Sequence, residues 1–114
     1  MKMTHTAGMM QACIDACNRC AQSCYECMRA CLDMPDVAER RECIALLIEC
    51  AQMCQMSAAM MAMGGRFHRE HCELCAKVCD ACAEECGKFP EEHCRRCAEA
   101  CRNCAEECRK MAAM

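Results

Sequence analysis

The sequence predicts an all-α protein, an antiparallel up-down-up-down four-helix bundle whose core is lined with cysteine. Three observations lead to this fold class. Nineteen of the 114 residues are cysteine, most of them recur at spacings of three and four, and turn-forming residues divide the chain into four long segments. Residues three and four apart lie on one face of a helix, so each segment presents a stripe of thiols to the interior.

Three of the four predicted helices carry long stripes of this kind. We expect the first helix over residues 6–33, the third over 66–86 and the fourth over 90–111. Each contains the pattern CxxCxxxCxxCxxxC, which suggests duplication of a helical hairpin. The stripes consist of Cys13, Cys17, Cys20, Cys24, Cys27 and Cys31; of Cys72, Cys75, Cys79, Cys82 and Cys86; and of Cys94, Cys97, Cys101, Cys104 and Cys108.

The connections between the helices are short and rich in residues that end helices. Pro35 cannot continue a helix and marks the first turn. Gly64 and Gly65 end the second helix, because glycine tolerates the left-handed conformation of a helix C-cap. Gly87 caps the third helix, and Pro90 suits the first turn of the fourth. Short connections make successive helices antiparallel.

The second helix, expected over residues 36–63, differs from the others. Asp36 and Glu39 have the spacing of a capping box at its start. Its stripe holds only Cys43, Cys50 and Cys54, and Leu47 takes the place of a further thiol.

A second apolar stripe on this helix indicates an additional contact surface. Leu46, Met53 and Met60, widened by Ile44 and Ile48, give it more apolar area than one core requires. Two explanations stay open: closer packing against the first and third helices, or an interface between subunits.

Length and composition indicate one domain over residues 1–114. The net charge is −3 with acidic and basic residues interleaved, so no basic patch for nucleic acid is evident. We find no apolar stretch of about 18 residues that predicts a membrane span. The segment from Met1 to Thr6 lacks the apolar run of a secretion signal, so we expect a cytoplasmic protein.

The spacing of the cysteines favours metal binding over disulfides. Side chains four apart on a helix are separated by about 5–6 Å at Cβ, too far for a disulfide, which needs about 3.5–4.5 Å. Nineteen buried thiols in register are too many to be simple core filling. Thiolates select Cu(I), Zn(II) or iron–sulfur clusters. Zinc prefers four ligands in turns, and iron–sulfur motifs need loops and often Cys-Pro, which is absent from this sequence. CxxxC pairs within helices suit Cu(I) best.

Charge predicts the stoichiometry. Each bound thiol loses a proton, so two thiolates around one Cu(I) leave a net negative charge in the core, where charge is unfavourable. Near one copper for each cysteine, Cu⁺ replaces H⁺ and the core stays neutral. We therefore expect many Cu(I) ions held by bridging sulfurs.

One end of the bundle, the methionine end, continues the thiol stripes with other ligands. The next stripe positions are Met10, Met61, His68 and Met111, and we expect them to pass Cu(I) inward as neutral ligands. Nearby in sequence lie Met3, His5, Met9, Met56, Met60, Met63, His71 and Met114. At the opposite end the stripes reach Met34, Arg40 and Pro90, and His93 is interpreted as a surface residue. Methionines that fill gaps in the core are the alternative explanation.

These features together resemble the bacterial copper storage proteins. The resemblance extends from Cys13 to Cys108 and rests on inward thiols in CxxxC pairs with a methionine- and histidine-lined opening. Without an export signal the chain is similar to the cytosolic branch, which implies a homotetramer of four-helix bundles that stores Cu(I). The methionine-rich opening departs from that branch, which uses more histidine there.

The sequence therefore predicts a cytosolic Cu(I) storage protein rather than an enzyme. We find no Ser/His/Asp or paired-carboxylate arrangement in it, and its copper donor and acceptor proteins are not indicated. The alternative from another class is an electron-transfer protein that uses an iron–sulfur cluster or thiol–disulfide exchange. A zinc or general metal buffer is a third interpretation.

Overall fold

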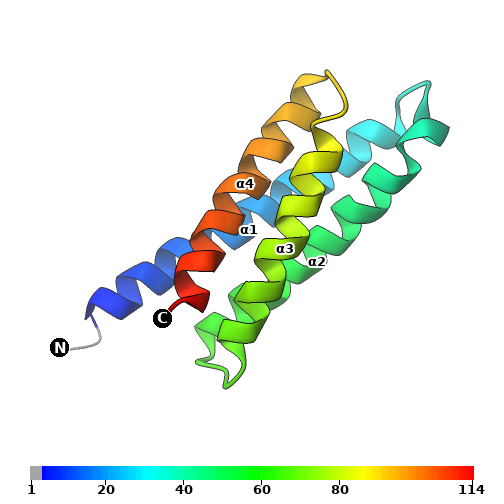
Figure 1. Cartoon of the computed structure of the whole chain (residues 1–114). Helices are drawn as coiled ribbons and strands as arrows, with labels where there is room; N and C mark the ends of the chain where they lie inside the picture. The colour runs from blue at the N-terminus through cyan, green and yellow to red at the C-terminus, as the bar shows by residue number, and fades with distance from the viewer. Residues whose placement is uncertain (1–3) are drawn as a thin grey trace.

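The computed structural model describes residues 4–114, with side chains from residue 8 onward. Its elements are α1 (Thr4–Leu32), the short 3₁₀ helix η1 (Val37–Arg40), α2 (Arg41–Ala62), α3 (His68–Cys86) and α4 (Glu92–Ala112). Figure 1 shows the four long helices side by side and antiparallel, with the start of α1 extending beyond the other helices. The predicted four-helix bundle is confirmed.

The helices are arranged as a square. The backbones of the pairs α1–α2, α2–α3, α3–α4 and α1–α4 lie side by side. Diagonal helices meet through their thiols at the centre, where the sulfurs of Cys54 on α2 and Cys104 on α4 are 3.7 Å apart. The molecule measures 54 × 21 × 18 Å. This long, narrow shape leaves room between the helices for one column of side chains, and the thiols fill it.

Small residues flank the thiols and let the helices approach. The buried alanines lie next to or near the cysteine stripes, and their methyl groups fill the gaps between neighbouring helices. They are Ala16, Ala21, Ala51, Ala58, Ala76, Ala83, Ala98 and Ala105. The core therefore consists of cysteine and alanine, with Leu47, Met61 and Met111 as its fully buried larger apolar side chains.

The turn between α2 and α3 forms as expected. Gly64 has a φ of +64°, in the left-handed region that glycine adopts without strain. The Gly65 N–H donates to the Met60 carbonyl at 2.8 Å, and the Gly64 N–H donates to the Met61 carbonyl at 3.1 Å. These bonds satisfy the last carbonyls of α2, which therefore ends before the two glycines.

The starts of all four helices differ from the sequence prediction, and α1 begins at Thr4 rather than residue 6. The prediction of a capping box at Asp36 and Glu39 is wrong. Val37–Arg40 forms a 3₁₀ helix and α2 begins at Arg41, and the Asp36 side chain makes no capping hydrogen bond. Asp36 instead forms an ion pair with Arg40. α3 begins at His68 rather than residue 66, and α4 at Glu92 rather than residue 90, so Pro90 precedes the helix.

The segment Val37–Ala62 is long and apolar enough to cross a membrane by length and composition alone, contrary to the sequence expectation. In the structure this segment supplies one side of the core through Cys43, Leu47, Cys50 and Cys54, all fully buried. Its hydropathy therefore reflects a core helix with an additional apolar face.

Candidate metal centre

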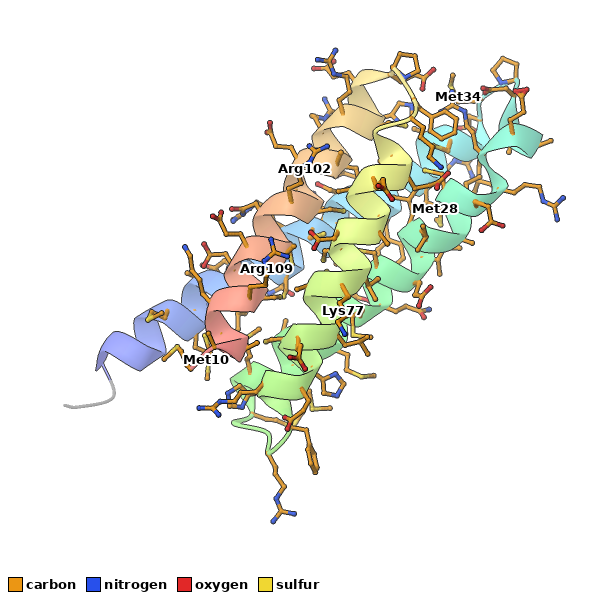
Figure 2. The ribbon with its side chains drawn as sticks, in the orientation of Figure 1. Met10, Met28, Met34, Lys77, Arg102 and Arg109 are labelled. Atoms are coloured by element: carbon orange, nitrogen blue, oxygen red, sulfur yellow. The ribbon has the colours of Figure 1, made fainter. Side chains whose placement is uncertain are left out.

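All nineteen cysteines lie in the interior as free thiols. Their exposed fractions are 0% except for Cys27 and Cys97, at 1% each. The sulfurs form a column along the bundle because the stripe of each helix faces the common axis. Figure 2 shows the contrast with the outer faces, where charged side chains such as Lys77, Arg102 and Arg109 extend outward.

Neighbouring sulfurs come together mainly across helices. The Sγ atoms of Cys17 and Cys104 are 3.6 Å apart, as are those of Cys20 and Cys101. Within a helix, the closest CxxxC pair is Cys75 and Cys79 at 3.9 Å. The CxxxC pairs predicted from the sequence thus account for some of the short sulfur contacts, but most of these contacts join two helices. This detail needs the packing of the bundle, which the spacing within one helix does not determine.

The sulfurs gather into overlapping groups of four. In each group the ligand atoms lie within 4.8 Å of one another. Examples are Cys17, Cys75, Cys104 and Cys108; Cys20, Cys24, Cys50 and Cys101; Cys20, Cys50, Cys54 and Cys79; and Cys24, Cys82, Cys97 and Cys101. Because several sulfurs belong to two groups, an ion in one group shares ligands with an ion in the next. The geometry therefore suits bridging thiolates.

Burial acts against charge on the core thiols, and at Cys94 it is the largest effect. Burial, and then repulsion by the neighbouring Cys31, raises the pKa of the Cys94 thiol from 9.0 to about 12. A thiol with this pKa is protonated at neutral pH. A soft cation that replaces the proton can bind without leaving a net charge in the core.

His93 lies against the thiols, so its interpretation as a surface residue is wrong. Its Nδ1 atom is 3.5 Å from the sulfurs of both Cys27 and Cys94, and its Nε2 atom is buried without a partner. His93 forms a fifth ligand group with Cys27, Cys31 and Cys94. Its position directly before Cys94 places it at the edge of the thiol stripe, a signal that the sequence did contain.

A small opening lies beside His93, between α1 and α4. It has a volume of about 10 Å³ and is lined by Ser23, Glu26, Cys27, His93, Arg96 and Cys97. Cys27 and Cys97 are the two thiols with any exposure. Arg40 lies at the same end of the bundle, buried beside Cys31 and Cys94. We call this end of the bundle the Arg40 end.

The methionine end is capped by thioethers. Met61 and Met111 are 1% and 2% exposed and belong to the same buried cluster as the thiols, and Met10 packs half-buried against that cluster. Figure 2 places Met10 where α4 ends and Met34 at the opposite end of the bundle. The Nδ1 atom of half-buried His68 lies 2.9 Å from the Gly65 carbonyl oxygen. No finding tests these four residues as ligands, so they stay a prediction.

The more distant methionines and histidines are not uniformly placed. Met56, Met63 and Met114 are exposed, whereas Met9 and Met60 are half-buried. The Nδ1 atom of His71 is buried without a partner. Met3 and the side chain of His5 lie outside the described residues.

Comparison with known proteins places this arrangement in a family. The sequence profile of the copper storage proteins matches residues 6–113. The chain belongs to the copper storage protein family. An apo structure of copper storage protein 3 from Bacillus subtilis is 43% identical, with a TM-score of 0.84, over 90% of this chain and 97% of that one.

Two metal-bound relatives are equally similar. A Cu(I)-bound copper storage protein, BsCsp3, is 42% identical, with a TM-score of 0.88, over 91% of this chain and 98% of that one. A cytosolic copper storage protein from Streptomyces lividans, solved with five coppers, is 40% identical, with a TM-score of 0.91, over 94% of both chains. The family resemblance predicted from the sequence is confirmed, and these relatives favour copper storage over the iron–sulfur or thiol-redox alternative.

The raised pKa of Cys94 predicts that high pH destabilises the metal-free protein. The folded state holds this proton up to about pH 12, whereas the unfolded chain releases it near pH 9. The stabilising contribution is therefore complete below pH 9 and is lost as pH rises toward 12. Between pH 9 and about pH 10.5 this thiol alone should lower the free energy of unfolding by about 2 kcal/mol.

Urea unfolding of the reduced apoprotein at both pH values measures this loss. The matched control is Cys94→Ala, in which the dependence on pH should be smaller. Equal dependence in the two proteins would show that Cys94 has an ordinary pKa.

Proposed function

We propose that this protein stores Cu(I) in the cytosol by binding many ions to its core thiolates. The observation that carries the proposal is the column of nineteen buried free thiols with shared four-sulfur groups. The Cu(I)-bound and five-copper structures of the relatives support the choice of metal. The relative described as cytosolic supports the location.

We propose all the cysteines of the sequence as ligands, and we add His93 because its Nδ1 atom lies 3.5 Å from the sulfurs of Cys27 and Cys94. The four residues of the methionine end, Met10, Met61, His68 and Met111, are proposed as weaker ligands that receive the ion. The thioether sulfur and the imidazole nitrogen are neutral and soft enough for Cu(I). They can therefore hold an ion briefly before thiolates bind it more strongly.

Storage without catalysis is the activity that these features support. The thiols are almost completely buried, and family membership points to a storage role. A substrate larger than a metal ion has no access to sulfurs with 0–1% exposure. We propose a binding protein rather than an enzyme, with copper ions as its partners and with no nucleic-acid or membrane partner.

We also propose that the chain forms a homotetramer through the apolar face of α2. Ile48 and Met56 on α2 are 37% and 49% exposed, and Leu74 on α3 is 48% exposed. Ile44 and Met53 are only partly covered by the core. This surface explains the excess hydropathy of α2 without a membrane, because a second copy of the chain can cover it.

The storage proposal predicts a large capacity. Anaerobic titration of the reduced protein with Cu(I), against a chromophoric chelator, should reach saturation above about ten ions per chain and approach the 19 thiols. Circular dichroism should show that helicity is already high before metal is added. Saturation at four or five ions, or folding only on addition of metal, would contradict storage.

Entry at the methionine end predicts a specific kinetic defect. Replacing Met10, Met61 and His68 with leucine removes the receiving ligands and roughly preserves volume, so Cu(I) loading should slow while the final capacity stays the same. Stopped-flow loading measures the rate. The comparison variant is His93→Leu, which alters the opening at the Arg40 end. If that variant slows loading and the triple variant does not, metal enters beside His93 instead.

The tetramer proposal predicts that one negative charge on the apolar face of α2 dissociates the tetramer. Light scattering after size exclusion should give four chains for the unaltered protein and fewer for Ile48→Glu, because a carboxylate would be buried in the interface. The control Asn103→Glu, on the exposed face of α4, should remain tetrameric. A monomeric unaltered protein, or an unchanged Ile48→Glu variant, would contradict this interface.

A further inference from the structure

Arg40 brings a fixed positive charge into the core. It is the last residue of η1 and is 1% exposed. Among the described side chains, the only buried polar or charged ones are Arg40 and Ser57. Burial of an arginine is unfavourable unless each of its donors is paired, so the partners of Arg40 show what it does.

The guanidinium divides its donors between carboxylates and sulfurs. Nε donates to Asp36 at 2.7 Å and Nη2 donates to Glu91 at 2.8 Å. Nη1 donates to the sulfur of Cys31 at 3.8 Å and to that of Cys94 at 3.7 Å. The Phe89 ring covers the group, with its centroid 4.4 Å from the Arg40 Cζ atom. One nitrogen of the guanidinium is thus directed entirely at thiols.

The charges around this site are unequal in their exposure to water. The side chains of Asp36 and Glu91 are 39% and 26% exposed, so water screens their charge. The sulfurs of Cys31 and Cys94 are fully buried and 3.8 Å apart. Arg40 therefore acts on them through a dry contact, where electrostatic interactions are stronger. Glu91 opposes it, because a carboxylate oxygen lies 4.0 Å from the Cys94 sulfur.

The first copper ion needs such a charge more than the later ones do. When copper is scarce, two thiols bind one Cu⁺ and release two protons to solvent, and the resulting bis-thiolate site has a net charge of −1. No redox step is involved. Later ions bind sulfurs that are already shared, and the core returns to neutrality. Hydrogen bonds to charged acceptors are roughly twice as strong as neutral ones, so Arg40 stabilises the bis-thiolate over the thiols.

We propose that Arg40 makes the Cys31–Cys94 pair the site that the first Cu(I) ion occupies. Arg40 is a positioning residue that does not bind the metal. Its guanidinium is the counter-ion of a two-thiolate site at this end of the core, with His93 available as a neutral third ligand. The inference rests on the proposed storage function and adds to it a defined order of loading.

The first test compares affinities for the first equivalent of Cu(I). Competition with a chromophoric chelator should show that Arg40→Met binds the first ion about tenfold to a hundredfold more weakly, which corresponds to loss of hydrogen bonds to a charged group. Its capacity at saturation should be unchanged. The control is Arg41→Met, at the adjacent exposed residue, which should bind the first ion normally.

A second variant separates the charge from a structural role. Glu91→Gln keeps the shape of the side chain but removes the negative charge beside Cys94, so the first ion should bind more tightly. Arg40 lies in the connection between α1 and α2, and Glu91 lies in the connection between α3 and α4. If Arg40 served only to hold these two connections together, loss of its ion pair with Glu91 would loosen the site and weaken Cu(I) binding. Weaker binding in Glu91→Gln would therefore overturn the proposal, even if Arg40→Met failed to fold.

Diffraction at the copper absorption edge locates the ion directly. Crystals of the unaltered protein given one equivalent of Cu(I) should show their strongest anomalous peak between Cys31 and Cys94. A peak elsewhere, with high capacity retained, would overturn the role of Arg40 and leave storage intact. Saturation at only a few ions would instead contradict the storage function itself.

Discussion

The structure depends on one electrostatic constraint: a thiolate in a dry core must have a cation next to it. Nineteen thiols are buried with at most 1% exposure, and burial raises the pKa of Cys94 to about 12. The Cys94 thiol is therefore neutral in the metal-free protein, and burial acts against ionisation of the core sulfurs until metal arrives. Proton and Cu⁺ are alternative occupants of the same sulfur, so the bundle keeps its charge balance in both states.

The fold meets this constraint through the packing of four antiparallel helices. Backbone hydrogen bonds are satisfied within each helix, so the interior is free for side chains that serve only as ligands. Alanine beside cysteine lets the helices approach, and sulfurs of different helices then lie 3.6–4.0 Å apart. Shared four-sulfur groups follow from that spacing. Capacity is thus a property of the whole column, while the two ends differ: thioethers cap one, and Arg40 and His93 lie at the other.

The stripe pattern predicted most of this arrangement. Spacings of three and four, and of seven where Leu47 replaces a thiol, place every cysteine inside. Gly64 ends α2 in the expected left-handed conformation. The sequence could not show which sulfurs meet, because most short contacts join helices whose rotation is fixed only by packing. The capping box predicted at Asp36 does not form, because the Asp36 carboxylate bonds to the Arg40 side chain instead of to the backbone. His93 was misplaced because a residue beside a stripe can face either the core or the solvent.

Proton release on copper loading tests the constraint most directly. Cu(I) would be added anaerobically, as a complex with a neutral ligand, to reduced protein in weak buffer near pH 7, and released protons would be counted with a pH-stat. If Cu⁺ replaces H⁺ on bridging thiolates, the total at saturation should be close to one proton for each bound ion. A total near two protons for each ion would mean isolated two-thiolate sites with negative charge retained in the core, and would contradict this account.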